Sequence, residues 1–330
     1  MAPPNHDDRR YISTGHLPIE AQVASAVRDV HARYAGETAG EVSRVYPALA
    51  RVPAGLFGVS VVAASGNVYE AGDAAYPFSI MSVSKPFVLA LVCQAEGWER
   101  VRDGVGANAT GRAFNSVAAI EASADGRTNP MVNSGAIATT SLVPGGSVSD
   151  RWAFIHTGLS RFAGRELALD EDVFASAGET NFRNRSIAQF LHSRGRVFCD
   201  PAEAVDLYTR QCSLSVTAHD LAVMGATLAD GGVNPLTRER VVDADACRYA
   251  LAVMATAGMY ESSGEWLCDI GLPGKSGIGG GIVTVSPGKG GLGTFAPPLD
   301  EAGNSVRGIL AAKALSHRLG LDLFMSQPAM

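Results

Sequence analysis

The sequence predicts an α+β protein in which strands from both ends of the chain share one antiparallel sheet. Two predicted hairpins and the long segment between them are the basis of this prediction. Residues 56–69 contain a β-branched run, a Ser-Gly-Asn turn and a second short strand, and residues 281–295 contain two strands around a Pro-Gly-Lys-Gly turn. The intervening segment, from about Ser79 to Ala257, is rich in alanine and leucine with helical periodicity.

Three segments show clear helical patterns. Apolar residues from Val23 to Tyr34 recur at steps of three and four and predict an amphipathic helix that ends near Gly36. Leu221–Leu228 precede an Asp-Gly-Gly stop signal, and Val306–Leu319 predict a closing helix. We expect a polar, disordered tail over residues 1–17 and a single domain over residues 18–330, with a helical subdomain at about 90–250.

Composition limits the classes of function. The chain has 330 residues, of which 46% are hydrophobic and 18% charged, and this suits a globular protein with a large core. A formal net charge of −6 argues against binding to nucleic acid or to anionic membrane surfaces. The N-terminal residues do not resemble a signal peptide and no later run reaches transmembrane length, so a cytoplasmic protein that binds a small molecule is expected.

The cysteines and histidines predict neither a metal site nor a cofactor. Five widely spread cysteines form no CxxC pair, and seven histidines form no HExxH pattern. We therefore expect reduced thiols and no metal.

A Ser-x-x-Lys pattern, Ser82 with Lys85, stands just before an apolar run. If Ser82 opens a helix, the two side chains lie on one face with Cβ atoms about 5–6 Å apart. A desolvated lysine can lose its proton and then accept the proton of the serine hydroxyl. The pattern alone is also compatible with a helix cap beside a solvated lysine.

A second motif makes the catalytic interpretation more specific. Lys275-Ser276-Gly277 precedes a strand, and Lys-Ser/Thr-Gly on an edge strand accompanies Ser-x-x-Lys in penicillin-recognising enzymes. A phosphate-binding loop is the competing interpretation. However, the first glycine of that motif falls at Asp269, and a strand rather than a helix follows.

With these motifs in place, the chain resembles the bacterial-type serine-dependent glutaminases from about Ile19 to about Leu323. The segments that carry the resemblance occur in one order along the chain: Phe114–Ser116, Asn129–Ile137, Arg183–Arg185, Tyr208, Gln211–Ser213, Gly258–Tyr260, Lys275–Gly277, Pro297–Asp300 and Gly303–Gly308. The resemblance implies a β-lactamase/DD-peptidase-like fold and hydrolysis of L-glutamine to L-glutamate and ammonia through an acyl-enzyme. We also expect a homo-oligomer, either a dimer or a tetramer.

The resemblance also implies a role for each matching residue. Ser82 is expected to be the nucleophile, Lys85 its base, and Tyr208 a relay for the proton to the leaving ammonia. The substrate-binding residues are expected to be Asn133, Asn184 and Tyr260, together with Ile278, whose backbone N–H forms an oxyanion hole with that of Ser82. The asparagines could instead cap turns, and the tyrosines could be packing residues.

Two departures from the family pattern concern the substrate. Ala177 stands where the family has a glutamate that contacts the substrate ammonium, and Val45 stands where it has a tyrosine, with Tyr46 one residue on. Glu179 could supply the missing charge, because residues two apart in an extended segment point to the same side.

Other readings stay open at this point. The site could act on a different primary amide, or the chain could be a non-catalytic binding protein on the same fold. A β-lactam or peptide hydrolase is a further alternative.

Overall fold

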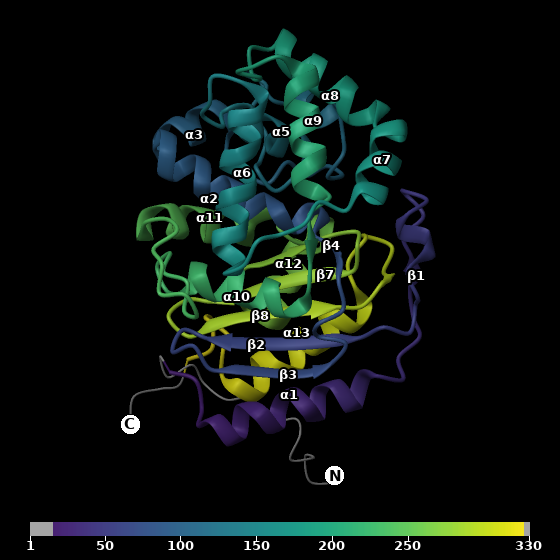
Figure 1. Ribbon diagram of the computed structural model, residues 1–330, viewed down its shortest axis with the longest axis vertical. Helices are drawn as coiled ribbons and strands as arrows, with labels where there is room; N and C mark the ends of the chain where they lie inside the picture. Colours follow the sequence, from purple (N-terminus) through teal and green to yellow (C-terminus); the bar gives the residue numbers. More distant parts are fainter. Residues whose placement is uncertain (1–15, 327–330) are drawn as a thin grey trace.

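The computed structural model describes residues 16–326 and shows a sheet-containing part below a helical part (Figure 1). The central sheet has five antiparallel strands in the order β3-β2-β8-β7-β6. In that order the strands span Val68–Gly72, Gly58–Ala63, Gly290–Phe295, Gly281–Ser286 and Gly274–Ser276. Both predicted hairpins are confirmed as β2–β3 and β7–β8. Because β2 pairs with β8, strands from both ends of the chain share the sheet, as predicted.

Helices cover both faces of this sheet. Helices α1 (Glu20–Tyr34), α12 (Ser263–Ile270) and α13 (Val306–Leu319) pack on one face, around a cluster that includes Val27, Ile282 and Leu315. Helix α10 (Ala218–Ala229) packs on the other face. The three predicted helices are confirmed, although α1 and α10 begin three residues earlier than their apolar patterns indicate.

Helix α10 approaches the sheet closely because β8 has glycines on the contact face. A Cβ atom on Gly293 would lie 2.0 Å from the carbonyl oxygen of Ala218, and one on Gly291 would lie 2.3 Å from that of Ala222. Helix backbone and strand backbone are therefore in direct contact, and no side chain larger than a hydrogen atom fits between them.

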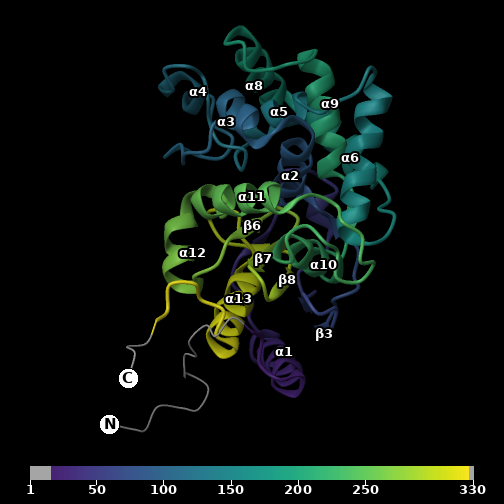
Figure 2. The ribbon, with the colours of Figure 1, turned by 90° about the vertical axis from the view of Figure 1, so that its left-hand side faces the viewer.

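The helical part surrounds a helix that is buried on all sides. This helix is α2 (Ser84–Glu96), and all its residues from Ser84 to Cys93 are buried. The helices of this part around α2 are α3 (Trp98–Val105), α4 (Ala118–Ala122), α5 (Asn133–Ser141), α6 (Val148–Ala163), α7 (Glu171–Thr180), α8 (Phe182–Ser193) and α9 (Pro201–Cys212). Helix α11 (Ala244–Ala257) lies between this part and the sheet (Figure 2).

Short elements join the two parts. The two-residue strand β4 (Phe78–Ser79) pairs with β5 (Ser215–Val216), and β1 (Glu41–Val42) pairs with β9 (Pro298–Leu299). Three 3-10 helices, η2, η3 and η4, span Leu49–Arg51, Met81–Val83 and Tyr260–Ser262. The β4–β5 pair places the start of η3 beside the end of α9.

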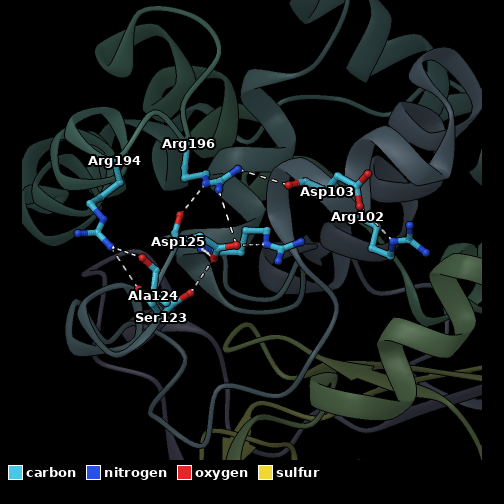
Figure 3. Close-up of polar contacts among 8 residues, drawn as sticks. Arg102, Asp103, Ser123, Ala124, Asp125, Arg194 and Arg196 are labelled. Atoms are coloured by element: carbon cyan, nitrogen blue, oxygen red, sulfur yellow. Dashed lines mark hydrogen bonds and ion pairs between the residues drawn. The ribbon is translucent and has the colours of Figure 1, made fainter.

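Arginines brace the largely irregular connection from α3 to α5 (Figure 3). Arg196 donates to the carbonyl oxygen of Asp125 at 2.8 Å, Arg194 donates to that of Ala124 at 3.0 Å, and Arg127 pairs with the Asp125 carboxylate. Hydrogen bonding from the backbone N–H of Arg127 lowers the pKa of Asp125 to about 2. At the end of the connection, the backbone N–H of Asn133 donates to the carbonyl oxygen of Phe114 at 2.8 Å, which helps to place Asn133.

The predicted polar tail falls almost entirely outside the described residues. Of its described part, Leu17 packs against the cluster formed by α1, α13 and the sheet. Among the residues that the structure describes, no helix is both long and apolar enough to cross a membrane.

The contact between α10 and β8 predicts that Gly293→Ala strongly destabilises the protein. The added methyl group meets the Ala218 carbonyl oxygen, and we expect a loss of about 3 kcal/mol in the free energy of unfolding. Gly264→Ala in α12 is the control, because a Cβ there meets no atom within 4 Å. Urea denaturation of both variants is the measurement, and equal midpoints would contradict the proposed contact.

Candidate functional site

Ser82 lies in η3, which contacts strands β6 and β7 as well as helices α2 and α9 and so stands at the junction of the two parts. The expectation that Ser82 opens a helix needs one correction: Ser82 belongs to a 3-10 turn, and the α-helix begins at Ser84. The preceding residue, Met81, has a φ of +48°, in the left-handed region that side chains rarely adopt. A strained residue directly before a serine is a feature that functional sites commonly show.

Lys85 contacts the Ser82 hydroxyl. Its Nζ atom lies 3.0 Å from Ser82 Oγ and 2.8 Å from Asn133 Oδ1. The lysine is 2% exposed, and this burial lowers its pKa to about 8. The amine is therefore partly neutral near physiological pH, and the neutral form can accept a proton from Ser82.

A chain of buried amides leads away from Lys85. Asn133 donates from Nδ2 to Asn184 Oδ1 at 3.1 Å, and Asn184 donates to Asn181 Oδ1 at 2.7 Å. Asn181 then donates to Thr209 Oγ1 at 2.8 Å. Each side-chain amide of this hydrogen-bonded series has a partner, which fixes the orientation of the side chains.

Two tyrosines lie near this centre. The hydroxyl of Tyr208 donates to Asn133 Oδ1 at 3.1 Å, and the Tyr208 ring lies 5.8 Å from Lys85 Nζ. The hydroxyl of Tyr260 donates to the backbone carbonyl of Ser276 at 3.0 Å. Burial raises the pKa of Tyr208 well above its ordinary value, so its hydroxyl stays protonated.

Lys275 is the second lysine of the centre. It extends from the edge strand β6, as its motif predicted, and is fully buried with its Nζ atom 4.3 Å from the centre of the Tyr260 ring. Burial, together with the nearby charge of Lys85, holds the pKa of Lys275 well below its usual value.

Backbone groups of two segments meet at Ser82. Gly277 lies so close that a Cβ on it would be 3.3 Å from the Ser82 backbone nitrogen, and Ile278 follows in the turn between β6 and β7. N–H groups in the first turn of a helix have no acceptor within that helix. The Ser82 N–H, in the turn η3, is therefore a candidate donor to a ligand oxygen.

A cavity of about 230 Å³ opens onto this centre. It is lined by Ser82, four more predicted site residues, and mostly apolar or amide-bearing neighbours. The lining residues are Val45, Tyr46, Met81, Ser82, Phe114, Asn115, Asn133, Ala177, Thr180, Asn181, Arg183, Asn184, Tyr208, Thr209, Cys212, Ser213 and Ile278. Lys85 contacts Ser82 without lining the cavity, and the Tyr260 ring packs in a tilted arrangement against the wall residue Phe114, with ring centres 4.7 Å apart.

The structural premise for Glu179 is wrong. Residues 176–179 are not extended but belong to helix α7, where residues two apart point about 200° apart. Ala177 is buried in the cavity wall, whereas Glu179 is exposed and does not line the cavity. Glu179 is therefore removed from the set of substrate-binding candidates.

The structure adds residues to the site that the sequence argument did not select. Asn181 and Thr209 complete the amide chain, and Tyr46 lines the cavity beside Val45. A helical-spacing argument could have found Asn181, because it stands three residues before Asn184. Lys275 also joins the site, although its Lys-Ser-Gly motif did not predict a role for the side chain.

Other parts of the described chain offer no comparable centre. Within residues 16–326, no group of three or more His, Cys, Asp or Glu side chains could hold a metal ion. A cavity of about 400 Å³ lies beside the α3–α5 connection and is lined by Arg102, Arg127 and their neighbours, but by none of the Ser82 cluster. The chemistry-bearing side chains therefore concentrate at Ser82.

Comparisons with known proteins agree on one family. A family model described as Glutaminase matches residues 40–324. Glutaminase 2 from Yersinia pestis is 68% identical over 318 residues, covering 96% of this chain and 94% of the relative. A glutaminase from Mycobacterium marinum is 48% identical, covering 92% of this chain and 95% of the relative.

Solved structures agree with these sequence relatives. The structure of the probable glutaminase ybaS has a TM-score of 0.92 and 45% identity, covering 94% of this chain and 100% of that one. A probable glutaminase from Bacillus subtilis, complexed with 6-diazo-5-oxo-L-norleucine, has a TM-score of 0.82 and 30% identity, covering 91% and 96% of the two chains.

Proposed function

The chain belongs to the glutaminase family, and from that premise we propose how its own residues perform the reaction. It is an amide hydrolase that converts L-glutamine and water into L-glutamate and ammonia. The β-lactamase-like fold expected from the sequence is confirmed by the family's solved structures. The relatives do not favour a non-catalytic protein or an enzyme that has lost glutamine as its substrate.

The observation that carries the proposed mechanism is the 3.0 Å contact between Lys85 Nζ and Ser82 Oγ. A neutral Lys85 has one lone pair, which can accept the Ser82 proton while an N–H group still donates to Asn133. Ser82 Oγ then attacks the side-chain amide carbon of glutamine. The pKa of Lys85, lowered by burial to about 8, makes this base available near neutral pH.

The tetrahedral intermediate then loses ammonia. Backbone N–H groups of Ser82 and Ile278 stabilise the oxyanion in our proposal, because both segments line the cavity beside the nucleophile. Tyr208 donates a proton to the leaving nitrogen and takes back the Ser82 proton directly from the Lys85 ammonium, because the two groups are neighbours at Asn133 Oδ1. Water then splits the Ser82 ester and releases glutamate.

Asn133, Asn184 and Tyr260 are proposed to hold the substrate. The two asparagines line the cavity with orientations fixed by their mutual hydrogen bond, and Tyr260 supports its wall through Phe114. Arg183 lies at the same cavity, where its guanidinium suits the substrate carboxylate.

The first test is ammonia release from L-glutamine by the purified protein. Wild type should release ammonia, and Ser82→Ala should lower kcat by about a thousandfold or more because the acyl-enzyme cannot form. The matched control is Ser84→Ala. Ser84 lies two residues further along the chain, and its hydroxyl donates to the Met81 carbonyl oxygen. Equal turnover by Ser82→Ala and wild type would overturn the proposed nucleophile.

The second prediction concerns pH. Lys85 must be neutral to act as a base, so kcat/KM should rise with pH and level off above about 8, where the lysine has lost its proton. Lys85→Arg should be inactive throughout, because a guanidinium does not deprotonate in this range. A flat wild-type profile between about pH 6 and pH 9 would contradict the role of Lys85.

We further propose a cytoplasmic homo-oligomer, a dimer or tetramer. Five cysteines without a disulfide among the described residues are compatible with a reducing compartment. Exposed apolar side chains such as Phe182 and Phe198 could be covered by another copy. Light scattering coupled to size exclusion should give at least twice the chain mass, and a monomer at micromolar concentration would refute the oligomer.

A further inference from the structure

The substrate cavity has no acidic wall. Among its lining residues, all within the described part of the chain, there is no aspartate or glutamate, and Arg183 is the single permanently charged side chain. An α-carboxylate has a cationic partner there. An α-ammonium group has none of opposite charge.

Nearby carboxylates are directed elsewhere. On α7, the exposed Asp172 pairs with Arg51, and the exposed Glu179 lies away from the cavity. Beyond η4, Asp300 accepts a hydrogen bond from the backbone N–H of Asn304 and does not line the cavity. The position on α7 that faces the cavity is the methyl group of Ala177, which is 3% exposed.

The absence of a countercharge affects substrate selection. An ammonium that leaves water without a carboxylate partner loses hydration that the uncharged amides and hydroxyls of this wall replace only in part. A substrate without that ammonium avoids this cost and keeps the groups that the cavity can recognise, the amide and the carboxylate. Discrimination between the two kinds of substrate therefore has no strong electrostatic basis at this site.

We propose that this enzyme also hydrolyses ω-monoamides of dicarboxylic acids that lack a charged α-amino group. The simplest is glutaramate, which is glutamine without its amino group. Ser82 Oγ bonds to the amide carbon, the C–N bond breaks, and the amide nitrogen takes up the proton that Ser82 lost and leaves as ammonia. Water then adds its hydroxyl to the acyl carbon and returns a proton to Ser82 Oγ, which gives glutarate. The inference rests on the proposed function and widens its substrate class.

N-Acyl glutamines belong to the same class when the acyl group can extend out of the cavity. The wall offers an outlet at Val45, which lines the cavity and is 58% exposed. N-Acetyl-L-glutamine tests this outlet, because acylation removes the positive charge and adds bulk at the same atom.

The test compares kcat/KM for L-glutamine and glutaramate, measured by ammonia release from the same wild-type preparation. The two values should agree within about tenfold. A preference for L-glutamine larger than that overturns the inference but leaves the glutaminase function intact. No ammonia from either compound overturns the proposed function itself, so the two failures are distinguishable.

A variant pair tests the physical cause. Ala177→Glu introduces a carboxylate into the wall and should raise the preference for L-glutamine over glutaramate by about tenfold or more at low ionic strength, with the gain shrinking as salt is added. Ala177→Gln, of nearly the same size but uncharged, should not raise it. An equal preference in both variants would mean that side-chain size rather than charge matters, and would overturn the electrostatic argument. The wild-type comparison remains decisive if either variant fails to fold.

Discussion

The site depends on keeping one lysine out of water. Lys85 lies in the first turn of α2, a helix that is buried from Ser84 to Cys93 and packs largely against apolar side chains. That burial has a cost, because an ammonium in such a place is poorly solvated. The same cost lowers the pKa of Lys85 to about 8 and gives the serine a base. The large core built by the helical part is thus also the source of the site's chemistry.

The sequence predicted the sheet and its flanking helices because their patterns are local. Hairpin turns, β-branched runs and helical periodicity each lie within about twenty residues, and tertiary packing did not override them. The segment around Ala177 shows the opposite case. Its serine, glycine and threonine residues have weak helix propensity, yet a cap at Asp170 and the buried Val173 make it helical. The Glu179 hypothesis failed for that reason.

The residues of the candidate site also fall into those that the sequence predicts and those that it does not. Ser82 and Lys85 could be paired from helical spacing, and the resemblance brought Asn133, Asn184 and Tyr208 to them. Distance in sequence hid Thr209, which joins the centre through the packing of α9 against the end of α7. Whether a cavity wall carries a charge is likewise a property of the fold, because it depends on which face of α7 turns inward.

The side-chain hydrogen bonds that run from Asn133 through Asn184 and Asn181 to Thr209 all point the same way. An amide oxygen only accepts and an amide nitrogen only donates, and Asn133 Oδ1 already accepts from both Lys85 and Tyr208. Asn133 must therefore present its nitrogen to Asn184, which in turn orients Asn181. Turning Asn184 over would set its Nδ2 against the Nδ2 of Asn133 and its Oδ1 against the Oδ1 of Asn181. Lys85 and Tyr208 at one end thus determine, through Asn133, which way the next two amides are turned. The series therefore has a fixed donor-to-acceptor direction.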